Sequence, residues 1–227
     1  MLLSCEIENF VYYFEISGKY ACIKEIRRKV YDDNRIRKIV IPSEVHYGGY
    51  TYIVNAISGY TTQEKRYRRV TNDRRRKDYD KIIEDGTYES KHSMIGYLDE
   101  KFEWFGAEII LPNTICEIGP LVVGSGGCRA NIKLNDGLKF IRAGAFSSYH
   151  GRTINIPSSV KIIEDLAFCD CENLKLIIDN EPGAVKIGEK AIAKRDVIYS
   201  ICRPSDDFEI IYLRPKTSWL SKLINKL

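Results

Sequence analysis

The sequence lacks any apolar run that approaches the roughly 18 consecutive residues a helix needs to cross a bilayer, so we expect no transmembrane segment. Its first residues, MLLSCEIENF, lack the charged n-region and the full apolar stretch of a signal peptide. As written, the sequence therefore predicts a cytoplasmic location. The hydrophobic and charged fractions, 44% and 29%, are typical of an ordered, soluble chain.

Groups for catalysis are also scarce. The three histidines, His46, His92 and His150, are isolated from one another in the sequence. The glycines around Ser125 complete neither a P-loop nor a dinucleotide fingerprint, and the order of residues around Ser125 is not that of a nucleophile elbow. Because catalysis needs a nucleophile, a base and an orienting group together, we predict that the chain is not an enzyme and has no cofactor.

The seven cysteines are odd in number and scattered, which favours free thiols over a disulfide framework. Cys169 and Cys171 form a Cys-x-Cys pair, but no second Cys or His pair stands at ligand spacing. A structural zinc site needs four such groups, so we predict no metal. Three cysteines within the repeat described next, Cys116, Cys169 and Cys171, are predicted to pack in the core.

A short, regular repeat is what the sequence does contain. Three segments align without gaps, at residues 109–118, 132–141 and 154–163, and the period carries Leu111 to Leu134 and then to Ile156. An apolar-x-apolar triplet places two side chains on one face of a short strand, and the Pro or Asn that follows breaks the strand into a turn. One such unit cannot bury its own apolar face, so the units are expected to stack.

Two further features fit the stacked units. A second apolar pair follows each strand, at Val122-Val123, Ala145-Phe146 and Ala167-Phe168, and suits a second layer packed close to the first. A fourth, degraded copy places Leu176 and Ile178 in the strand position.

Residues 1–58 show a different β pattern. Apolar and aromatic residues alternate in 10–16 and 20–26, with a turn at Gly18-Lys19, and Gly48-Gly49 reads as a tight hairpin. The opening of the repeat also occurs once here, at residues 39–45. We predict that 1–58 form an antiparallel cap, with a first partial repeat, that shields the edge of the first coil.

The pattern Ile-x-Ile-Pro-Ser-Ser-Val-x-x-Ile, followed by Ala-Phe-x-x-Cys, in residues 154–171 resembles the BspA-type leucine-rich repeats of bacteria. The resemblance implies a right-handed solenoid, mainly β, with one short parallel strand per turn. It also implies a protein-binding role, because many similar proteins are surface or secreted proteins that bind host or matrix proteins. The family's cysteine position holds Cys171 in one unit and Tyr149 in the unit before it.

Residues 59–108 show no repeat and are predicted to be a charged insertion. Within 63–81 nine Lys or Arg face four acids, a net charge of +5 in a chain whose total is +4. Such a cluster attracts phosphates or an acidic partner, and a solvated loop is the alternative. The candidate partner-binding residues here are Arg68, Arg69, Arg74, Arg75, Arg76 and Trp104. Trp104 lies in a possible short amphipathic helix, 97–105, and would be a binding anchor if exposed.

Residues 109–214 are then the repeats, and 215–227 are predicted to be a C-terminal amphipathic helix that caps the last coil. The sequence as a whole predicts a non-catalytic module that binds a protein, for host or matrix interaction or for intracellular scaffolding. The alternative is a nucleic-acid-associated protein that binds through the basic insertion.

Overall fold

A computed structural model describes residues 3–28, 38–63, 89–92, 107–120, 122, 131–147, 149, 151–196, 201–204 and 208–214. Within these ranges the chain forms strands and turns but no helix, and therefore no helix that could span a membrane. The two helices predicted at 97–105 and 215–227 lie outside the described residues.

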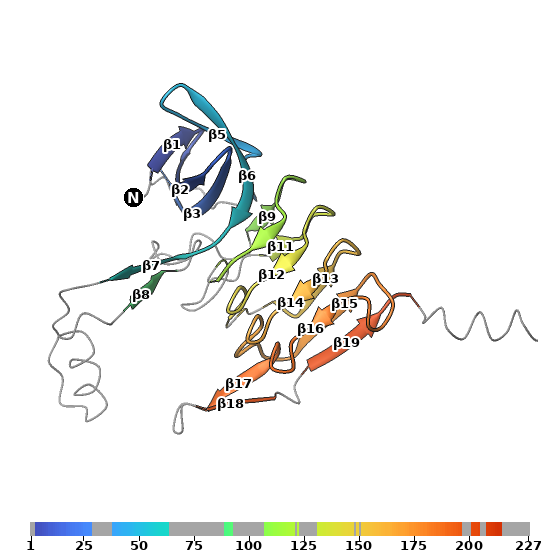
Figure 1. Ribbon diagram of the computed structural model, residues 1–227. Helices are drawn as coiled ribbons and strands as arrows, with labels where there is room; N and C mark the ends of the chain where they lie inside the picture. Colours follow the sequence, from blue (N-terminus) through green and yellow to red (C-terminus); the bar gives the residue numbers. More distant parts are fainter. Residues whose placement is uncertain are drawn as a thin grey trace, which may run out of the picture.

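The N-terminal part is a rolled sheet (Figure 1). Its strands are β1 (Leu3–Ile7), β2 (Phe10–Ser17), β3 (Tyr20–Arg28), β5 (Glu44–Tyr47) and β6 (Tyr50–Ile57). They pair in the order β1-β2-β3-β6-β5, antiparallel except for β3 with β6, and the two end strands β1 and β5 contact each other. The roll encloses a core that includes Tyr12, Phe14, Ile23, Val45 and Val54.

The turns of this cap lie where the sequence predicts them. Gly18, Gly48 and Gly49 all have positive φ, at 59°, 58° and 81°, a region that glycine enters without steric cost. Two consecutive positive-φ residues make the tight turn whose twist suits a hairpin, so Tyr47 stands directly opposite Tyr50.

The repeat region is a coil with two strands in each full turn, one more than the family resemblance implied. The first strands of the turns are β4 (Lys38–Val40), β9 (Glu108–Ile110), β11 (Asn131–Lys133), β13 (Thr153–Ile156), β15 (Leu174–Ile178) and β19 (Phe208–Tyr212). They pair in parallel as two three-stranded sheets, β4-β9-β11 and β13-β15-β19.

The second strands of the turns are much shorter. They are β10 (Glu117–Ile118), β12 (Phe140–Ile141), β14 (Ile162–Ile163) and β16 (Lys186–Ile187). These pair in parallel with one another, and β10 pairs with the end of β6. Since β6 pairs with β10 and β4 pairs with β9, the N-terminal part covers the first edge of the β10-β12-β14-β16 sheet and of the β9-β11 pair.

The interior of the coil is a set of stacked apolar rows. Ile118, Ile141 and Ile163 are fully buried at the same position of successive turns. Behind them Phe146 and Phe168 stack with ring centroids 5.2 Å apart and planes 8° from parallel. The predicted second layer is therefore present. Cys171 and Tyr149, which share a repeat position, are both buried, and the Cys171 thiol donates to the Phe146 carbonyl.

Two antiparallel hairpins interrupt the coil. The pair β17 (Ala193–Asp196) and β18 (Ile201–Pro204) precedes β19, and the pair β7 (Tyr60–Gln63) and β8 (Glu89–His92) follows β6. In β7–β8, Gln63 faces Glu89, so these two residues of the predicted insertion 59–108 lie side by side.

Candidate protein-binding surfaces

The tip of the β5–β6 hairpin carries the most exposed aromatic side chain that the structure describes. Tyr50 is 70% exposed and Tyr47, opposite it, is 44% exposed. Tyr47 also meets the buried ring of Phe14 edge to face, at a centroid distance of 6.4 Å. Below the tip, His46 and Thr51 share a hydrogen bond of 2.9 Å between the strands. The hairpin tip, Tyr47-Gly48-Gly49-Tyr50, is therefore an aromatic pair on a supported backbone.

A second surface is the outward side of β10, β12, β14 and β16, here called the ladder face. The first residue of β10, β12 and β14 points away from the core because the next residue of each strand is buried. The ladder face consists of these outward residues and the charged residues that flank them: Glu117, Lys139, Phe140, Arg142, Lys161, Ile162, Glu164 and Lys186.

Arg142 joins three turns of the coil on this face. Its guanidinium donates to Glu117 at 2.7 Å on one side and to Glu164 at 2.6 Å on the other, and it lies 4.8 Å from the Phe140 ring centroid. The carboxylates raise the pKa of Arg142, and the hydrogen bond from Arg142 lowers the pKa of Glu164. The three charges thus form a closed ladder across adjacent strands.

Arg142→Gln is expected to lower the free energy of unfolding by about 1 kcal/mol, since its ion pairs are a third exposed and screened by solvent. The depressed pKa of Glu164 means that the pair stabilises the fold above the pKa of the unfolded carboxyl. That stabilisation is lost as the pH falls through the folded value. Urea titrations at pH 7 and pH 3.5 should show the difference between variant and wild type shrinking at acidic pH. An equal difference at both would contradict the ladder.

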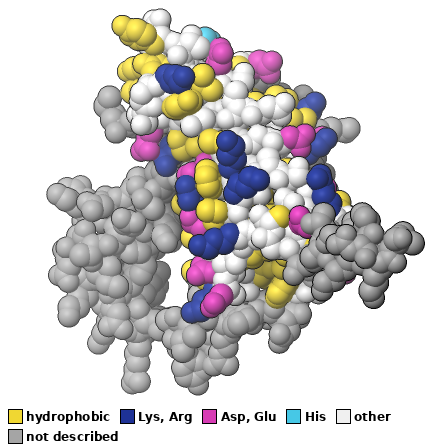
Figure 2. Space-filling view, turned by 45° about the vertical axis from the view of Figure 1, so that its right-hand side comes forward, with side chains coloured by type: hydrophobic (Ala, Val, Ile, Leu, Met, Phe, Trp, Pro, Cys, Tyr) yellow, Lys and Arg dark blue, Asp and Glu magenta, His cyan; other side chains and the backbone are white. Residues whose placement is uncertain are grey.

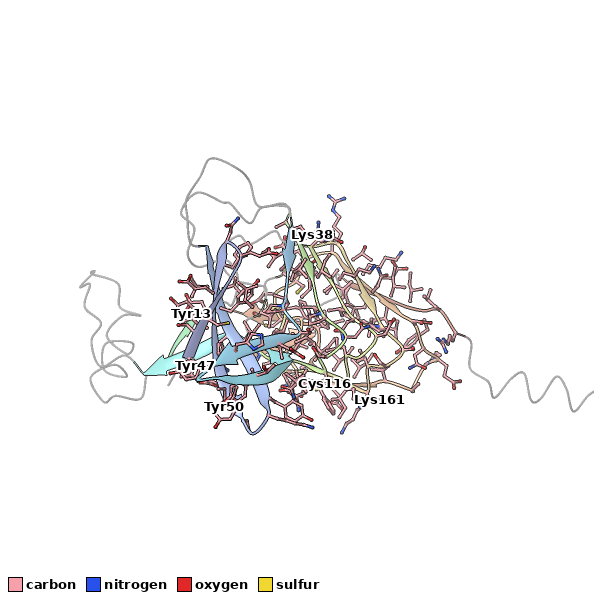
Figure 3. The ribbon with its side chains drawn as sticks, turned by 90° about the horizontal axis from the view of Figure 1, so that it is seen from above. Tyr13, Lys38, Tyr47, Tyr50, Cys116 and Lys161 are labelled. Carbon is pink, nitrogen blue, oxygen red and sulfur yellow. The ribbon has the colours of Figure 1, made fainter. Side chains whose placement is uncertain are left out.

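The hairpin tip and the ladder face are on one side of the molecule. Seen from above, Cys116 and Lys161, which occupy equivalent positions of the repeat, lie toward the same side as Tyr50, whereas Lys38 lies on the opposite side (Figure 3). In Figure 2, basic, acidic and hydrophobic side chains follow one another down the repeat coils below the cap.

The sequence predicts six partner-binding residues within the insertion 59–108. Arg68, Arg69, Arg74, Arg75, Arg76 and Trp104 all lie outside the described residues, so their role stays a prediction. One prediction was wrong: Cys116 is half-exposed, while Cys169 and Cys171 are buried as expected. Cys116 precedes β10 at the position that holds the exposed Lys139 and Lys161 in the next turns.

The described cysteines are poor nucleophiles where their pKa is shifted. Burial raises the pKa of the Cys22 thiol to about 11 and also raises that of Cys5, so both stay protonated at neutral pH. Among the described residues, no three His, Cys, Asp or Glu side chains are grouped to hold a metal ion.

The stacked turns, with parallel strands paired from one turn to the next, define a leucine-rich-repeat solenoid. Residues 106–212 match the BspA type leucine rich repeat region in six copies, so this part of the chain is a BspA-type leucine-rich-repeat region. The sequence resemblance is thereby confirmed.

Several solved structures are similar to this chain. A leucine rich cell surface protein from Faecalibacterium prausnitzii is 17% identical, with 85% of this chain and 54% of that chain covered and a TM-score of 0.36. For the pneumococcal vaccine antigen PcpA the identity is 13%, the coverages 94% and 49%, and the TM-score 0.45. A leucine-rich repeat protein from Bacteroides ovatus is 19% identical, with 81% of this chain and 40% of that chain covered and a TM-score of 0.41.

This chain thus spans about half of the length of these structures or less. No curated protein sequence matches it. The family assignment rests on the repeat match, because all three TM-scores are below 0.5.

Proposed function

We propose that this chain is a non-catalytic module that binds a protein partner, and that the hairpin tip is its principal contact. The observation that carries the proposal is the exposed pair Tyr47 and Tyr50 on a hairpin held by a two-glycine turn and by Phe14. Tyrosine offers a large amphipathic contact area at low cost in side-chain entropy. In most interfaces a small number of such residues supplies most of the binding free energy.

The rest of the cap supports this use. The hairpin is part of a rolled sheet whose inward side chains are buried in one core with those of the repeats, so little conformational entropy remains to be lost when a partner binds. Beyond their chain neighbours, no described atom lies within 4 Å of where a Cβ of Gly48 or Gly49 would stand, so nothing described packs against the outer side of the turn. Loops and turns placed on such scaffolds are common sites of recognition.

Tyr50→Ala is expected to raise the Kd of a partner by about 30-fold or more, the range of an anchor residue at an interface. The full chain would be immobilised and its ligands captured from bacterial and host lysates. After identification and purification, each ligand would be titrated by biolayer interferometry against wild type and variant. Tyr50 is the residue to change because Tyr47 also supports the fold through Phe14.

Phe208→Ala is the matched control, since it removes an exposed aromatic ring from β19, at the other end of the coil. It should leave the Kd within about twofold, as expected for a residue outside the contact. Ligands that bind Tyr50→Ala as tightly as the wild type would show that the hairpin tip is not the contact. Circular dichroism of both variants checks that the fold is retained.

A further inference from the structure

We propose that the ladder face binds an extended, acidic segment of a partner protein, with Lys139, Lys161 and Lys186 as the residues that receive its carboxylates. The proposal deepens the proposed function, because it assumes that the partner is a protein and adds its chemistry. It rests on residues other than the hairpin tip, so the two can fail separately.

The first step is the placement of the lysines. Lys139 and Lys161 lie side by side on adjacent strands, since the Lys161 amide donates to the Lys139 carbonyl at 2.9 Å. The Lys186 amide donates in turn to the Lys161 carbonyl at 2.9 Å. Adjacent strands are about 4.8 Å apart, so three ammonium groups are rooted within roughly 10 Å along the solenoid.

The second step is the imbalance of charge. The two carboxylates of this face, Glu117 and Glu164, both form ion pairs with Arg142. None of the three lysines forms an ion pair with any residue that the structure describes, and all three are exposed. Like charges on neighbouring strands repel one another, so carboxylates from a ligand would relieve a repulsion that the fold itself does not neutralise.

The third step is the apolar strip beside the lysines. Phe140 and Ile162 are half-buried and directly follow Lys139 and Lys161 in the sequence. They lie opposite each other on β12 and β14, and Glu117 and Lys186 occupy the same position on β10 and β16. A ligand that alternates acidic and apolar residues can therefore place one set on the lysines and the other on the strip. In an extended chain residues i and i+2 are about 6.6 Å apart, a spacing that flexible lysine side chains can match.

The face is poorly suited to nucleic acid for two reasons. The guanidinium of Arg142 covers a face of the Phe140 ring at 4.8 Å, which hinders a base from stacking there. A nucleic-acid backbone also carries a charge at every residue and has no apolar side chains to contact the strip of Phe140 and Ile162. A polypeptide with spaced carboxylates meets the lysines while its apolar side chains contact the strip.

Two fluorescein-labelled 12-residue peptides test the proposal by fluorescence anisotropy with the full chain. One alternates Asp and Leu, and the other has Ser in place of every Asp. The Asp peptide is expected to bind at least tenfold more tightly than the Ser peptide in 50 mM NaCl, and its Kd should rise several-fold in 300 mM NaCl. Absence of binding by the Asp peptide, or equal binding of the two, overturns the proposal.

The triple variant Lys139→Gln/Lys161→Gln/Lys186→Gln is expected to raise the Kd of the Asp peptide at least tenfold. The matched control removes the same charge from three exposed lysines elsewhere, Lys19, Lys38 and Lys133. If both triple variants weaken binding equally, net charge alone is responsible and the ladder face is not the site. A captured partner whose Kd depends on Tyr50 but not on these lysines would overturn this proposal and leave the proposed function standing.

Discussion

Phe168→Ala is expected to lower the free energy of unfolding by about 3–5 kcal/mol, the cost of emptying a fully buried phenylalanine site. The ring of Phe168 is stacked on that of Phe146, and its backbone amide donates to the Ala191 carbonyl of the following turn. The cavity would therefore open between three turns of the coil. In a solenoid each turn is stabilised mainly by its neighbours, so the loss is not confined to one unit.

Urea unfolding followed by circular dichroism measures this effect, and thermal unfolding should show a fall in Tm of about 10 °C. Phe140→Ala is the matched control, because Phe140 lies on the outward row of the same coil and is only half-buried. It should cost about 1 kcal/mol. If both variants lose the same stability, the second apolar layer does not hold the turns together as the structure implies.

The stacked layer is the part of the fold that the sequence predicts best. Phe146 and Phe168 are one repeat apart with an alanine before each, and such a row can be found without coordinates. The second strand of each turn is harder to predict. Glu117–Ile118 contains one inward residue, too few for a period of two to be visible. This two-residue strand forms because β6 and β12, on either side of it, offer backbone hydrogen-bond partners in register.

The charged ladder left a partial signal in the sequence. Arg142 and Glu164 are one repeat apart, so their side chains could have been placed on neighbouring strands, but Glu117 is at the repeat position of Phe140 and joins Arg142 diagonally. The exposure of Cys116 could also have been predicted, because the aligned positions hold Lys139 and Lys161. The prediction was wrong because the position in the repeat, and not the apolar character of cysteine, determines how far this side chain is buried.

The rolled cap shows the limit of local patterns. Its hairpins follow from glycines at the turns. The contact between β1 and β5, however, joins segments that are separated in the sequence by three other strands. This contact brings the Cys5 thiol to the backbone of His46. No short-range periodicity encodes that closure. The accessible hairpin tip depends on it, because Tyr47 is supported by Phe14 from another strand of the roll.

A second large effect is expected from Asn135→Asp, which changes one amide to a carboxyl without changing its shape. Asn135 is only 7% exposed, and its Nδ2 donates to the Ile115 carbonyl of the preceding turn at 2.8 Å. Its Oδ1 has no hydrogen-bond partner among the residues that the structure describes. An ionised aspartate there would place a carboxylate oxygen next to the Ile115 carbonyl oxygen in a buried site, with no hydrogen between them. We therefore expect the free energy of unfolding to fall by about 3 kcal/mol at pH 7.

The loss should depend on pH in a defined direction. Burial and the facing carbonyl both raise the pKa of the new carboxyl above its unfolded value of about 3.9, so the native state favours the protonated form. Above the unfolded pKa the variant loses stability relative to wild type, and the penalty fades as the pH falls toward that value, where the protonated carboxyl can donate to Ile115. Urea titrations of both proteins at pH 7 and pH 4 measure the difference.

Asp136→Asn is the control for charge alone, because Asp136 is the exposed neighbour of Asn135 and this change removes a carboxylate. It should alter stability by less than about 0.5 kcal/mol at either pH. A penalty for Asn135→Asp that is the same at pH 7 and pH 4 would mean that this amide is hydrated and does not link the two turns. A loss of stability that is smaller at pH 4 than at pH 7 would show that the hydrogen bond from Asn135 to Ile115 helps to fix the register of adjacent turns. Apolar contacts alone are not directional and would allow one turn to shift along the next.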